Sequence, residues 1–331
     1  MNDDSEIMDK ISGKKFLVTG ADGFVASHLI EKLVELGGDV MGLLRRDSFG
    51  TFKNINQLKD KIQIKWGDTQ DLSLVSDITK GVDVIYHLAA QSHVGYSIYN
   101  PYETVINDIV STLNILEASR KSDITRLIHA GSSEIYGLPQ YTPIDENHPL
   151  QPRSPYAAAK ASSENLLQSY YDTYNVPVVF SRFFNVFGPR QGLDQVIPKF
   201  ILQAMNNQDI TVYGDGNQSR DYTYVSDSVN AYCLLSIRKN LEGEKINFGS
   251  GSEIKMKDLA EIILNLTNSN SKIIFDGKLR SAETPRLLCN REKAKKLVGW
   301  EPKIPFEVGI KNTIEFFKDK KELHENLKFM T

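Results

Sequence analysis

The chain is poor in cysteine, lacks long apolar runs and has no strong excess of either charge. Its 331 residues include two cysteines, Cys233 and Cys289, which cannot form a disulfide framework and show no paired Cys/His spacing of a zinc site. The six histidines have no metal-ligand spacing either, so no metal is expected. No apolar run approaches the roughly 20 residues of a membrane span. A net charge of −3 gives no general attraction to nucleic acid or to an anionic membrane. The composition indicates a globular protein without nucleic-acid or membrane partners.

The first residues also lack the pattern of a signal peptide. The stretch MNDDSEIMDKIS is polar and acidic, whereas a signal peptide has a basic start and an apolar core. We therefore expect a cytoplasmic protein in which residues 1–13 form a flexible tail ahead of the first strand.

Short apolar runs alternate with helical patterns over the first half of the chain. Strand-like runs occupy residues 14–20, 39–44, 62–68, 82–90, 126–132 and 176–188, and helical patterns occupy 27–37, 72–78, 101–121 and 154–174. This alternation predicts an α/β fold with a doubly wound parallel sheet of the Rossmann type, whose ligands lie at the carboxyl ends of the strands. Residues 14–188 are the expected dinucleotide-binding domain, which also carries the catalytic residues. Shorter pieces rich in Gly, Asn, Asp and Ser follow, so residues 189–331 are expected to form mainly a smaller mixed α/β substrate-binding lobe.

The segment VTGADGFVASHL has the pattern of a phosphate-binding turn between the first strand and the first long helix. Gly20 permits the tight turn, and Gly23 lets backbone N–H groups approach a pyrophosphate at the positive end of the helix. Ala26 takes the third small position, where the helix packs against the strand. A glycine pattern alone is weak evidence, but the strand, turn and helix context supports a dinucleotide site. The residues of this turn expected against the cofactor are Gly20, Asp22, Gly23, Phe24 and Val25.

The end of the second strand bears on the choice between NAD and NADP. An acidic residue there would bind the adenosine ribose of NAD, but this sequence has Leu44 followed by Arg45 and Arg46. Two guanidinium groups suit a 2′-phosphate, so NADP is favoured. NAD stays open, because both arginines could be solvated loop charges and Asp47 could reach a ribose hydroxyl. Asp68 ends the third strand, where it could accept the adenine amino group. The same edge of the sheet supplies further residues expected against the cofactor: Thr69, Leu88, Ala89, Ala90 and Phe183.

Tyr156 and Lys160 are four residues apart on a predicted helix and therefore share one face. A free tyrosine has a pKa of about 10 and is a poor base at neutral pH. A lysine ammonium and a positive nicotinamide ring both favour the phenolate and lower that pKa. Lys160 would also bind the nicotinamide ribose. Ser132, in the GSS stretch that ends the preceding strand, would bind the reacting sugar hydroxyl and share its proton with Tyr156.

Several motifs together resemble the extended short-chain dehydrogenase/reductase family, the nucleotide-sugar epimerases and dehydratases. The resemblance runs from Lys14 to Phe317 and rests on TGADGF, HLAAQSHV, SSEIYG, PYAAAK, RFFNVFGPRQ, GDGNQSRDYTYVSD and GWEP. It implies an enzyme that binds NAD or NADP and a nucleoside diphosphate sugar. Redox-sensing or nucleic-acid-binding proteins on the same fold are a further class, but these often lose the tyrosine–lysine pair that is present here.

Glu134, within SSEIYG, distinguishes among the reactions of this family. Members that only epimerise C4 resemble this stretch with a small or hydroxyl residue there, whereas 4,6-dehydratases carry Glu, which removes the C5 proton once C4 is a ketone. The resemblance thus implies a 4,6-dehydratase in which hydride leaves C4, water departs across C5 and C6, and the hydride returns to C6. A 4-epimerase or a UDP-glucuronate decarboxylase stays open as the alternative, in which case Glu134 could be a solvated loop carboxylate.

Further motifs bear on the nucleotide and the leaving group. AAQSHV and LLRRDSFGT are similar to the GDP-mannose 4,6-dehydratase branch, which uses NADP, whereas VIPKFILQA and ETPRLLCNREKAKKLVGWEP are closer to epimerases and UDP-sugar enzymes. The nucleotide therefore stays open. Ser133 stands where deoxythymidine-diphosphate-glucose dehydratases have an acidic group for the leaving hydroxyl, so Glu134 itself is the candidate to return that proton.

The resemblance also implies residues for the rest of the substrate. Arg220 and Arg280 match phosphate contacts, and guanidinium groups suit a bidentate grip. Tyr213 could pack beside the base or within the core. His93 is expected to shape the sugar pocket rather than to act as a base. The full set expected against the substrate is Ser92, His93, Ser132, Asn185, Lys199, Tyr213, Arg220, Asn247 and Arg280. Family members pair the helices over 101–121 and 154–174 into a dimer seam, so a homodimer is expected, although the same apolar residues could be internal core.

Overall fold

The computed structural model describes residues 3–45, 53–278, 283–318 and 320. Arg46, Asp47 and Arg280, which the sequence suggested as ligand contacts, lie outside these ranges. Within the described residues, no helix is both long and apolar enough to cross a membrane.

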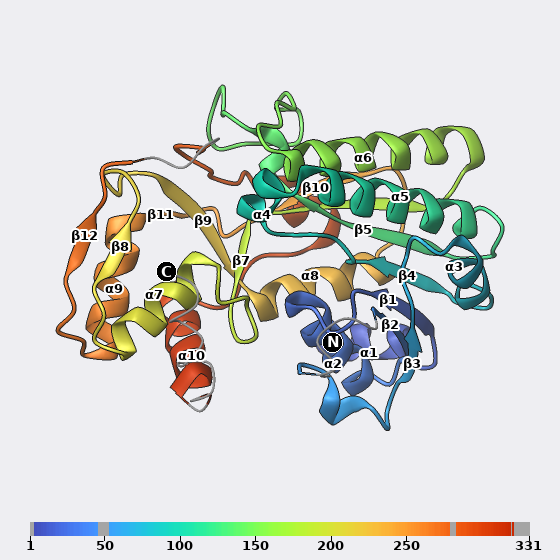
Figure 1. The fold of residues 1–331 in the computed structure, drawn as a ribbon. Coiled ribbons are helices and arrows are strands. Elements are labelled where there is room, and N and C mark those ends of the chain that lie inside the picture. Colours follow the sequence, from blue (N-terminus) through green and yellow to red (C-terminus); the bar gives the residue numbers. More distant parts are fainter. Residues whose placement is uncertain (1–2, 46–52, 279–282, 319, 321–331) are drawn as a thin grey trace.

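A seven-stranded parallel sheet forms the centre of the larger part of the molecule (Figure 1). Its strand order is β10-β6-β5-β4-β1-β2-β3, so the order along the chain reverses between β1 and β4. The strands are β1 (Lys15–Thr19), β2 (Asp39–Leu44), β3 (Gln63–Trp66), β4 (Val84–His87), β5 (Arg126–Ser132), β6 (Val178–Phe183) and β10 (Lys245–Phe248). Doubly wound sheets bind ligands at this reversal, outside the carboxyl ends of the strands.

Successive side chains of a strand point to opposite faces of the sheet, and here both sets are apolar. Helices therefore cover both faces. On one face, Leu17 and its neighbours pack with α3 (Leu72–Ile78), α5 (Pro101–Ser119) and α6 (Pro155–Tyr174). On the other, Phe16 and Val18 pack with α2 (Phe24–Glu35) and α8 (Val225–Ile237). Figure 1 shows these two helical layers above and below the strands. The fold class expected from the alternating pattern is confirmed.

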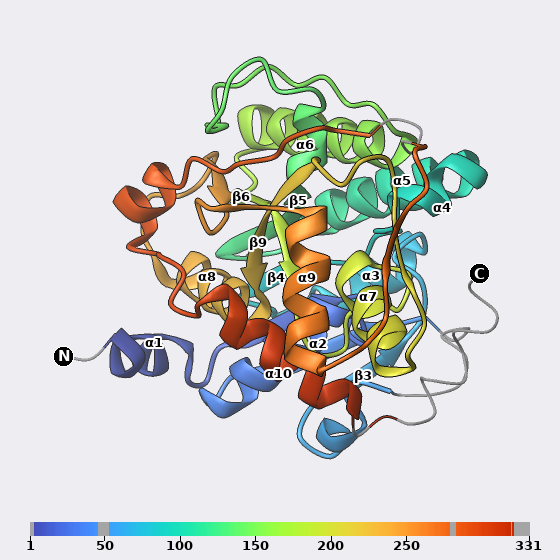
Figure 2. The same cartoon turned by 90° about the vertical axis from the view of Figure 1, so that its left-hand side faces the viewer.

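The smaller lobe has its own core and two small sheets. One sheet has the order β11-β9-β7, and β8 pairs with β12. Its elements are β7 (Asn185–Phe187), α7 (Val196–Met205), β8 (Ile210–Val212), β9 (Ser219–Tyr224), β11 (Glu253–Lys255), α9 (Met256–Thr267), β12 (Ile273–Phe275) and α10 (Phe306–Lys318). Figure 2 views this lobe from its own side, where α7, α9 and α10 lie close together. Their apolar faces form a second core, separate from the cores on the large sheet.

Two features differ from the expected domain plan. Residues 3–11 form a helix, α1 (Asp3–Ile11), and not a flexible tail, because Ile7 and Ile11 lie one turn apart and are buried beside α8. The chain also returns to the large sheet after residue 188, since α8 packs against α2 and β10 pairs with β6. The two parts are therefore interleaved along the sequence.

Candidate active site

A cavity of about 1370 Å³ lies at the carboxyl ends of the large sheet and continues to the smaller lobe. Loops after β1, β2, β3, β4 and β5 supply one wall, and α7, β8 and β9 supply the other. All of the site residues expected from the sequence that the structure describes line this cavity, with the exception of Asn247. The sequence had placed them in segments up to 200 residues apart, and the strand order brings them together.

The glycine turn after β1 forms a cradle that side chains would fill. Gly20 has a φ of +68°, and a Cβ there would lie 3.0 Å from the Cα of Ala89. A Cβ on Gly23 would lie 2.9 Å from the carbonyl oxygen of Gly20. Gly23 is the N-cap of α2, and no side chain caps this helix end. Free backbone N–H groups at a positive helix end fit a pyrophosphate, so the turn fits a dinucleotide.

The residues that the sequence predicted to lie against the adenosine have mixed roles. Asp22 does not offer a free carboxylate, because Oδ1 accepts hydrogen bonds from the backbone N–H groups of Asn54 and Ile55, at 2.9 and 3.2 Å. It holds the following loop in place. Asp68 and Arg45 lie at the cavity edge, with a carboxylate oxygen of Asp68 3.9 Å from a guanidinium nitrogen of Arg45. A positive and a negative group therefore line this end of the cavity as an ion pair.

Tyr156 lies in the first turn of α6, which begins at a helix start well specified by the sequence. The Ser154 hydroxyl accepts from the N–H of Ala157 at 3.1 Å, and Pro155 takes the position where a missing N–H costs nothing. Burial raises the pKa of Tyr156, and a hydrogen bond with Ser132 opposes this rise. Ser132 also caps the short helix η2 (Ser133–Tyr136) by accepting from the N–H of Glu134 at 3.2 Å. The tyrosine, the serine and the glutamate are thus fixed relative to one another.

Glu134 is partly buried, and its carboxylate faces the same cavity as Tyr156. Burial raises the pKa of this carboxyl group; the positive charge of Arg220 lowers it and the negative charge of Glu283 raises it. The neighbouring Ser133 is buried at the cavity wall. A carboxyl group whose pKa is raised, next to a tyrosine and a serine, can take up a proton and return it.

The smaller lobe presents basic and amide groups to the cavity. Arg220 on β9 donates to Glu283 at 2.5 Å and to the carbonyl oxygen of Thr284 at 2.7 Å. Lys199 on α7 lies 5.8 Å from the ring centre of Tyr213. Asn185 has a buried side-chain oxygen without a hydrogen-bond partner. The two cations suit a phosphorylated ligand, whereas the Asn185 oxygen can accept a hydrogen bond from a ligand hydroxyl.

Ser92 lines the cavity, and the neighbouring His93 connects the two walls of the cavity. Its Nδ1 accepts from the N–H of Tyr96 at 3.0 Å and so caps α4 (Val94–Tyr99). Its Nε2 lies 3.3 Å from a carboxylate oxygen of Asp194 in the loop before α7. Both ring nitrogens of His93 are therefore engaged within the protein, and its role in shaping a sugar pocket stays a prediction.

Asn247 does not face the cavity, which contradicts its expected role with substrate. It is fully buried on β10, where its Oδ1 accepts from the Tyr136 hydroxyl at 2.7 Å and its amide nitrogen donates to the carbonyl oxygen of Ile144. The side chain holds the long loop after η2 against the sheet.

A family model described as GDP-mannose 4,6 dehydratase matches residues 17–313. The chain belongs to this family, within the extended short-chain dehydrogenases/reductases. The human dTDP-D-glucose 4,6-dehydratase is 35% identical over 318 residues, covering 92% of this chain and 90% of that protein. The solved structure of the epimerase Mth375 from Methanothermobacter thermautotrophicus has a TM-score of 0.92 and 31% identity, covering 98% of this chain and 99% of that one. UDP-glucuronic acid 4-epimerase from Bacillus cereus, solved with UDP-glucuronic acid and NAD, has a TM-score of 0.87 at 28% identity, covering 92% and 99%.

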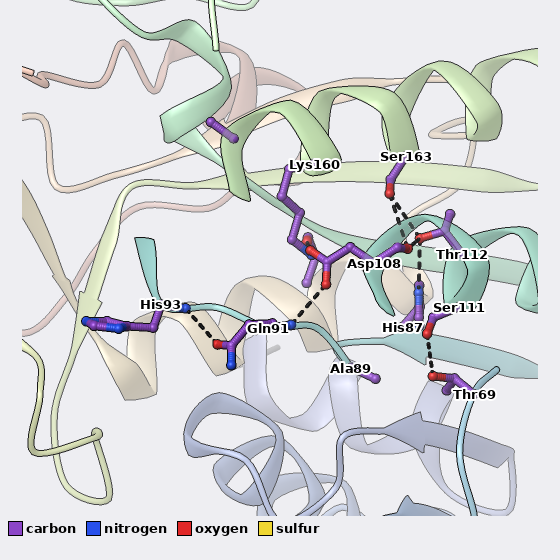
Figure 3. A network of polar contacts seen from close by, with 12 residues as sticks. Thr69, His87, Ala89, Gln91, His93, Asp108, Ser111, Thr112, Lys160 and Ser163 are labelled. Carbon is purple, nitrogen blue, oxygen red and sulfur yellow. Dashed lines mark hydrogen bonds and ion pairs between the residues drawn. The ribbon is translucent and has the colours of Figure 1, made fainter. Parts of the chain in front are cut away.

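Several residues that line the cavity, and one buried residue below it, were not found by sequence reasoning. Asp108 lies on α5 beside Lys160 (Figure 3). Glu283 forms an ion pair with Arg220. Asp194 contacts His93. Gln203 and Gln218 have buried side-chain oxygens without partners. Asp108 had a usable signal, a carboxylate in the middle of an otherwise apolar helical pattern. The others lie in loops or on a lobe whose placement the sequence pattern does not give.

Proposed function

We propose that the protein is a nucleotide-sugar 4,6-dehydratase, and the observation that carries this proposal is Glu134. Its carboxylate lies in one cavity with Tyr156, Lys160 and Ser132. A reaction that only moves hydride at C4 needs one base, whereas dehydration needs a second group for the C5 proton. Glu134 is that second group.

Each of these residues has a defined task in the proposed reaction. The Gly20–Gly23 turn and Lys160 would hold a nicotinamide cofactor, which would supply the redox chemistry by accepting hydride from C4 and returning it to C6. Tyr156, assisted by Ser132, takes the proton of the C4 hydroxyl. Glu134 takes the C5 proton and passes it to the hydroxyl that leaves C6 as water. When the hydride returns to C6, C5 takes up one proton from the solvent, and Tyr156 releases to the solvent the proton that it took from the C4 hydroxyl. The product is a 4-keto-6-deoxy sugar, so the atoms balance as substrate minus one water.

Charge argues against the decarboxylase alternative. Its substrate would carry a sugar carboxylate, which would have to lie near Glu134 and Glu283. Among the residues that the structure describes, Arg220 is the cation that affects the pKa of Glu134, and it is already bound by Glu283. Like charges repel strongly in a poorly solvated site, so a neutral hexose fits better.

A 4-epimerase is the second candidate, because Ser132, Tyr156 and Lys160 would serve it equally and the Methanothermobacter relative is named an epimerase.

The test is to incubate the protein with GDP-mannose, UDP-glucose, UDP-N-acetylglucosamine, dTDP-glucose and UDP-glucuronate and to measure the masses of the products. Loss of water from a neutral hexose supports the proposal and identifies the nucleotide. An unchanged mass with a new isomer makes the protein an epimerase, and loss of carbon dioxide makes it a decarboxylase.

We propose NADP as the preferred cofactor, with NAD as the alternative that the relatives solved with NAD support. Arg45 lies at the adenosine end of the cavity, where it can meet a 2′-phosphate. Arg45→Gln should weaken NADP binding about tenfold, the loss of one charged contact, and leave NAD binding unchanged. Calorimetric titration with both nucleotides measures this. Tighter binding of NAD than of NADP by the unmodified protein would overturn the preference.

We also propose that the protein forms a homodimer through α5 and α6, which lie side by side on one face of the sheet (Figure 1). Tyr102, Ile106 and Leu113 are exposed at helical spacing on α5 and so form one apolar face, the kind of surface that a partner covers. Tyr102→Glu should shift sedimentation equilibrium toward monomer. Phe275→Glu, an exposed aromatic in the other lobe, is the control that should leave association unchanged. A monomeric unmodified protein would refute the dimer.

A further inference from the structure

The short helix η2, which carries Glu134, is too short to be stable by itself. It is a single turn of four residues, and a single turn gains few hydrogen bonds for the backbone angles that it fixes. The backbone bonds of Glu134 are local: its N–H donates to the Ser132 hydroxyl at 3.2 Å, and its carbonyl oxygen accepts from the N–H of Gly137 at 3.2 Å. The direction of the Glu134 side chain therefore also depends on the side chains that anchor this turn in the protein.

Tyr136, the last residue of η2, anchors the turn in the protein interior. The residue is fully buried. Its hydroxyl accepts from Nη1 of Arg182 on β6 at 2.8 Å and donates to Oδ1 of Asn247 on β10 at 2.7 Å. The guanidinium carbon of Arg182 also lies 5.2 Å from the centre of the Tyr136 ring. The hydroxyl is thus used both as donor and as acceptor, and one side chain connects η2 with two strands of the large sheet.

The same network extends to the helix that carries Tyr156. Arg182 forms an ion pair with Glu164 on α6, with a nitrogen–oxygen distance of 2.6 Å, and both side chains are almost fully buried. Asn247 in turn donates from its amide nitrogen to the carbonyl oxygen of Ile144 at 3.1 Å. The network therefore connects the helix of one proposed acid–base group, Tyr156, with the turn that carries the other, Glu134.

A buried network of this kind needs a reason, because burying an ion pair removes two charges from water and apolar side chains of the same volume often give equal or greater stability. A fully satisfied polar network instead holds its members in one arrangement. This network ends at the turn from which Glu134 lines the cavity. We propose that Tyr136, held by Arg182 and Asn247, is a positioning residue that fixes the Glu134 carboxylate relative to Tyr156. The inference rests on the proposed function for the role of Glu134.

The test is Tyr136→Phe, which keeps the buried ring and removes the hydroxyl. A carboxylate that is no longer fixed samples several directions, so the rate of water loss should fall about tenfold or more. Oxidation at C4, followed as the appearance of reduced cofactor in a single turnover, does not use Glu134 and should be unchanged. Tyr86→Phe is the matched control, because this tyrosine on β4 is also fully buried and its hydroxyl donates to the carbonyl oxygen of Tyr232. It should leave both rates unchanged.

A measurement without substrate tests the same inference independently of the reaction. The titration midpoint of Glu134 is followed by NMR in protein labelled with [13Cδ]glutamate, and its signal is assigned through Glu134→Gln. Burial raises the pKa of this carboxyl group, and the charged groups that affect it, Arg220 on β9 and Glu283, stay in place in Tyr136→Phe, as does Tyr156 on α6. A carboxylate released from its position is better hydrated, so its midpoint should fall toward that of an ordinary glutamate.

An unchanged midpoint in folded Tyr136→Phe protein would overturn the inference, and so would an equal loss of both rates, which indicates a general structural defect. If that variant does not fold, the same midpoint is measured in Tyr136→Phe combined with Asn247→Leu, which removes the acceptor that phenylalanine leaves unpaired. If the unmodified protein changes no nucleotide sugar, the proposed function fails, and the titration still decides whether Tyr136 fixes the carboxylate.

Discussion

Replacement of Glu134 by Gln should slow loss of water from the nucleotide sugar by about 10²- to 10⁴-fold, the usual contribution of a general acid–base group. The amide cannot take the C5 proton, but Ser132, Tyr156 and Lys160 are untouched. Hydride transfer from C4 should therefore persist, and absorbance of the reduced cofactor should rise within a single turnover and then stay. Deuterium from the solvent should enter C5 in the unmodified protein and not in the variant.

The pH dependence of this step follows from the environment of Glu134. Burial raises the pKa of its carboxyl group, and only the ionised form can take the C5 proton. The rate of water loss should therefore fall, as the pH is lowered, at a higher pH than an ordinary glutamate would give. Water loss at an unchanged rate in Glu134→Gln would show that the carboxylate is a bystander.

Replacement of Glu164 by Ala should destabilise the fold by about 3–5 kcal/mol, the usual effect of leaving one member of a buried ion pair alone. Glu164 on α6 and Arg182 on β6 are almost fully buried, with a nitrogen–oxygen distance of 2.6 Å. Arg182 also donates to the Tyr136 hydroxyl at 2.8 Å, and Tyr136 donates to Asn247. The pair thus joins α6, the sheet and the loop after η2.

Urea unfolding measures this loss as a lower midpoint. The matched control is Asp77→Asn, which removes an exposed ion pair with Lys80 and should leave the midpoint unchanged. A variant of Glu164 that unfolds at the same urea concentration as the unmodified protein would show that water or another group replaces the carboxylate.

The parts of the structure that local patterns determine could be predicted from the sequence. The strand at 126–132 and the helix at 72–78 match the observed β5 and α3, because their apolar spacing and flanking turn residues are local signals. The glycine turn was also predictable, since a tight turn with close backbone approach requires Gly20 and Gly23 at fixed offsets.

The parts that depend on distant contacts could not be predicted. Residues 1–13 are mostly polar, and Ile7 and Ile11 are too few to indicate a helix from the sequence. They stabilise α1 only because they pack against α8, a distant part of the chain. Asn247 was assigned to the substrate because nothing in its neighbourhood in the sequence reveals Tyr136, a residue 111 positions away, as its partner. The contact of His93 with Asp194 could not be predicted either, because Asp194 lies far away in the sequence and in the other lobe.

The return of the chain to the large sheet has a consequence for synthesis on the ribosome. Without β10 and α8, the edge of β6 has no neighbour and the apolar face of α2 has no cover. A nascent chain that ends near residue 188 therefore has an exposed strand edge, a site for misassembly. The sheet becomes complete only after residue 248 has left the ribosome, so the two lobes should mature in one late step, and a gene fragment ending at residue 188 should yield aggregated protein.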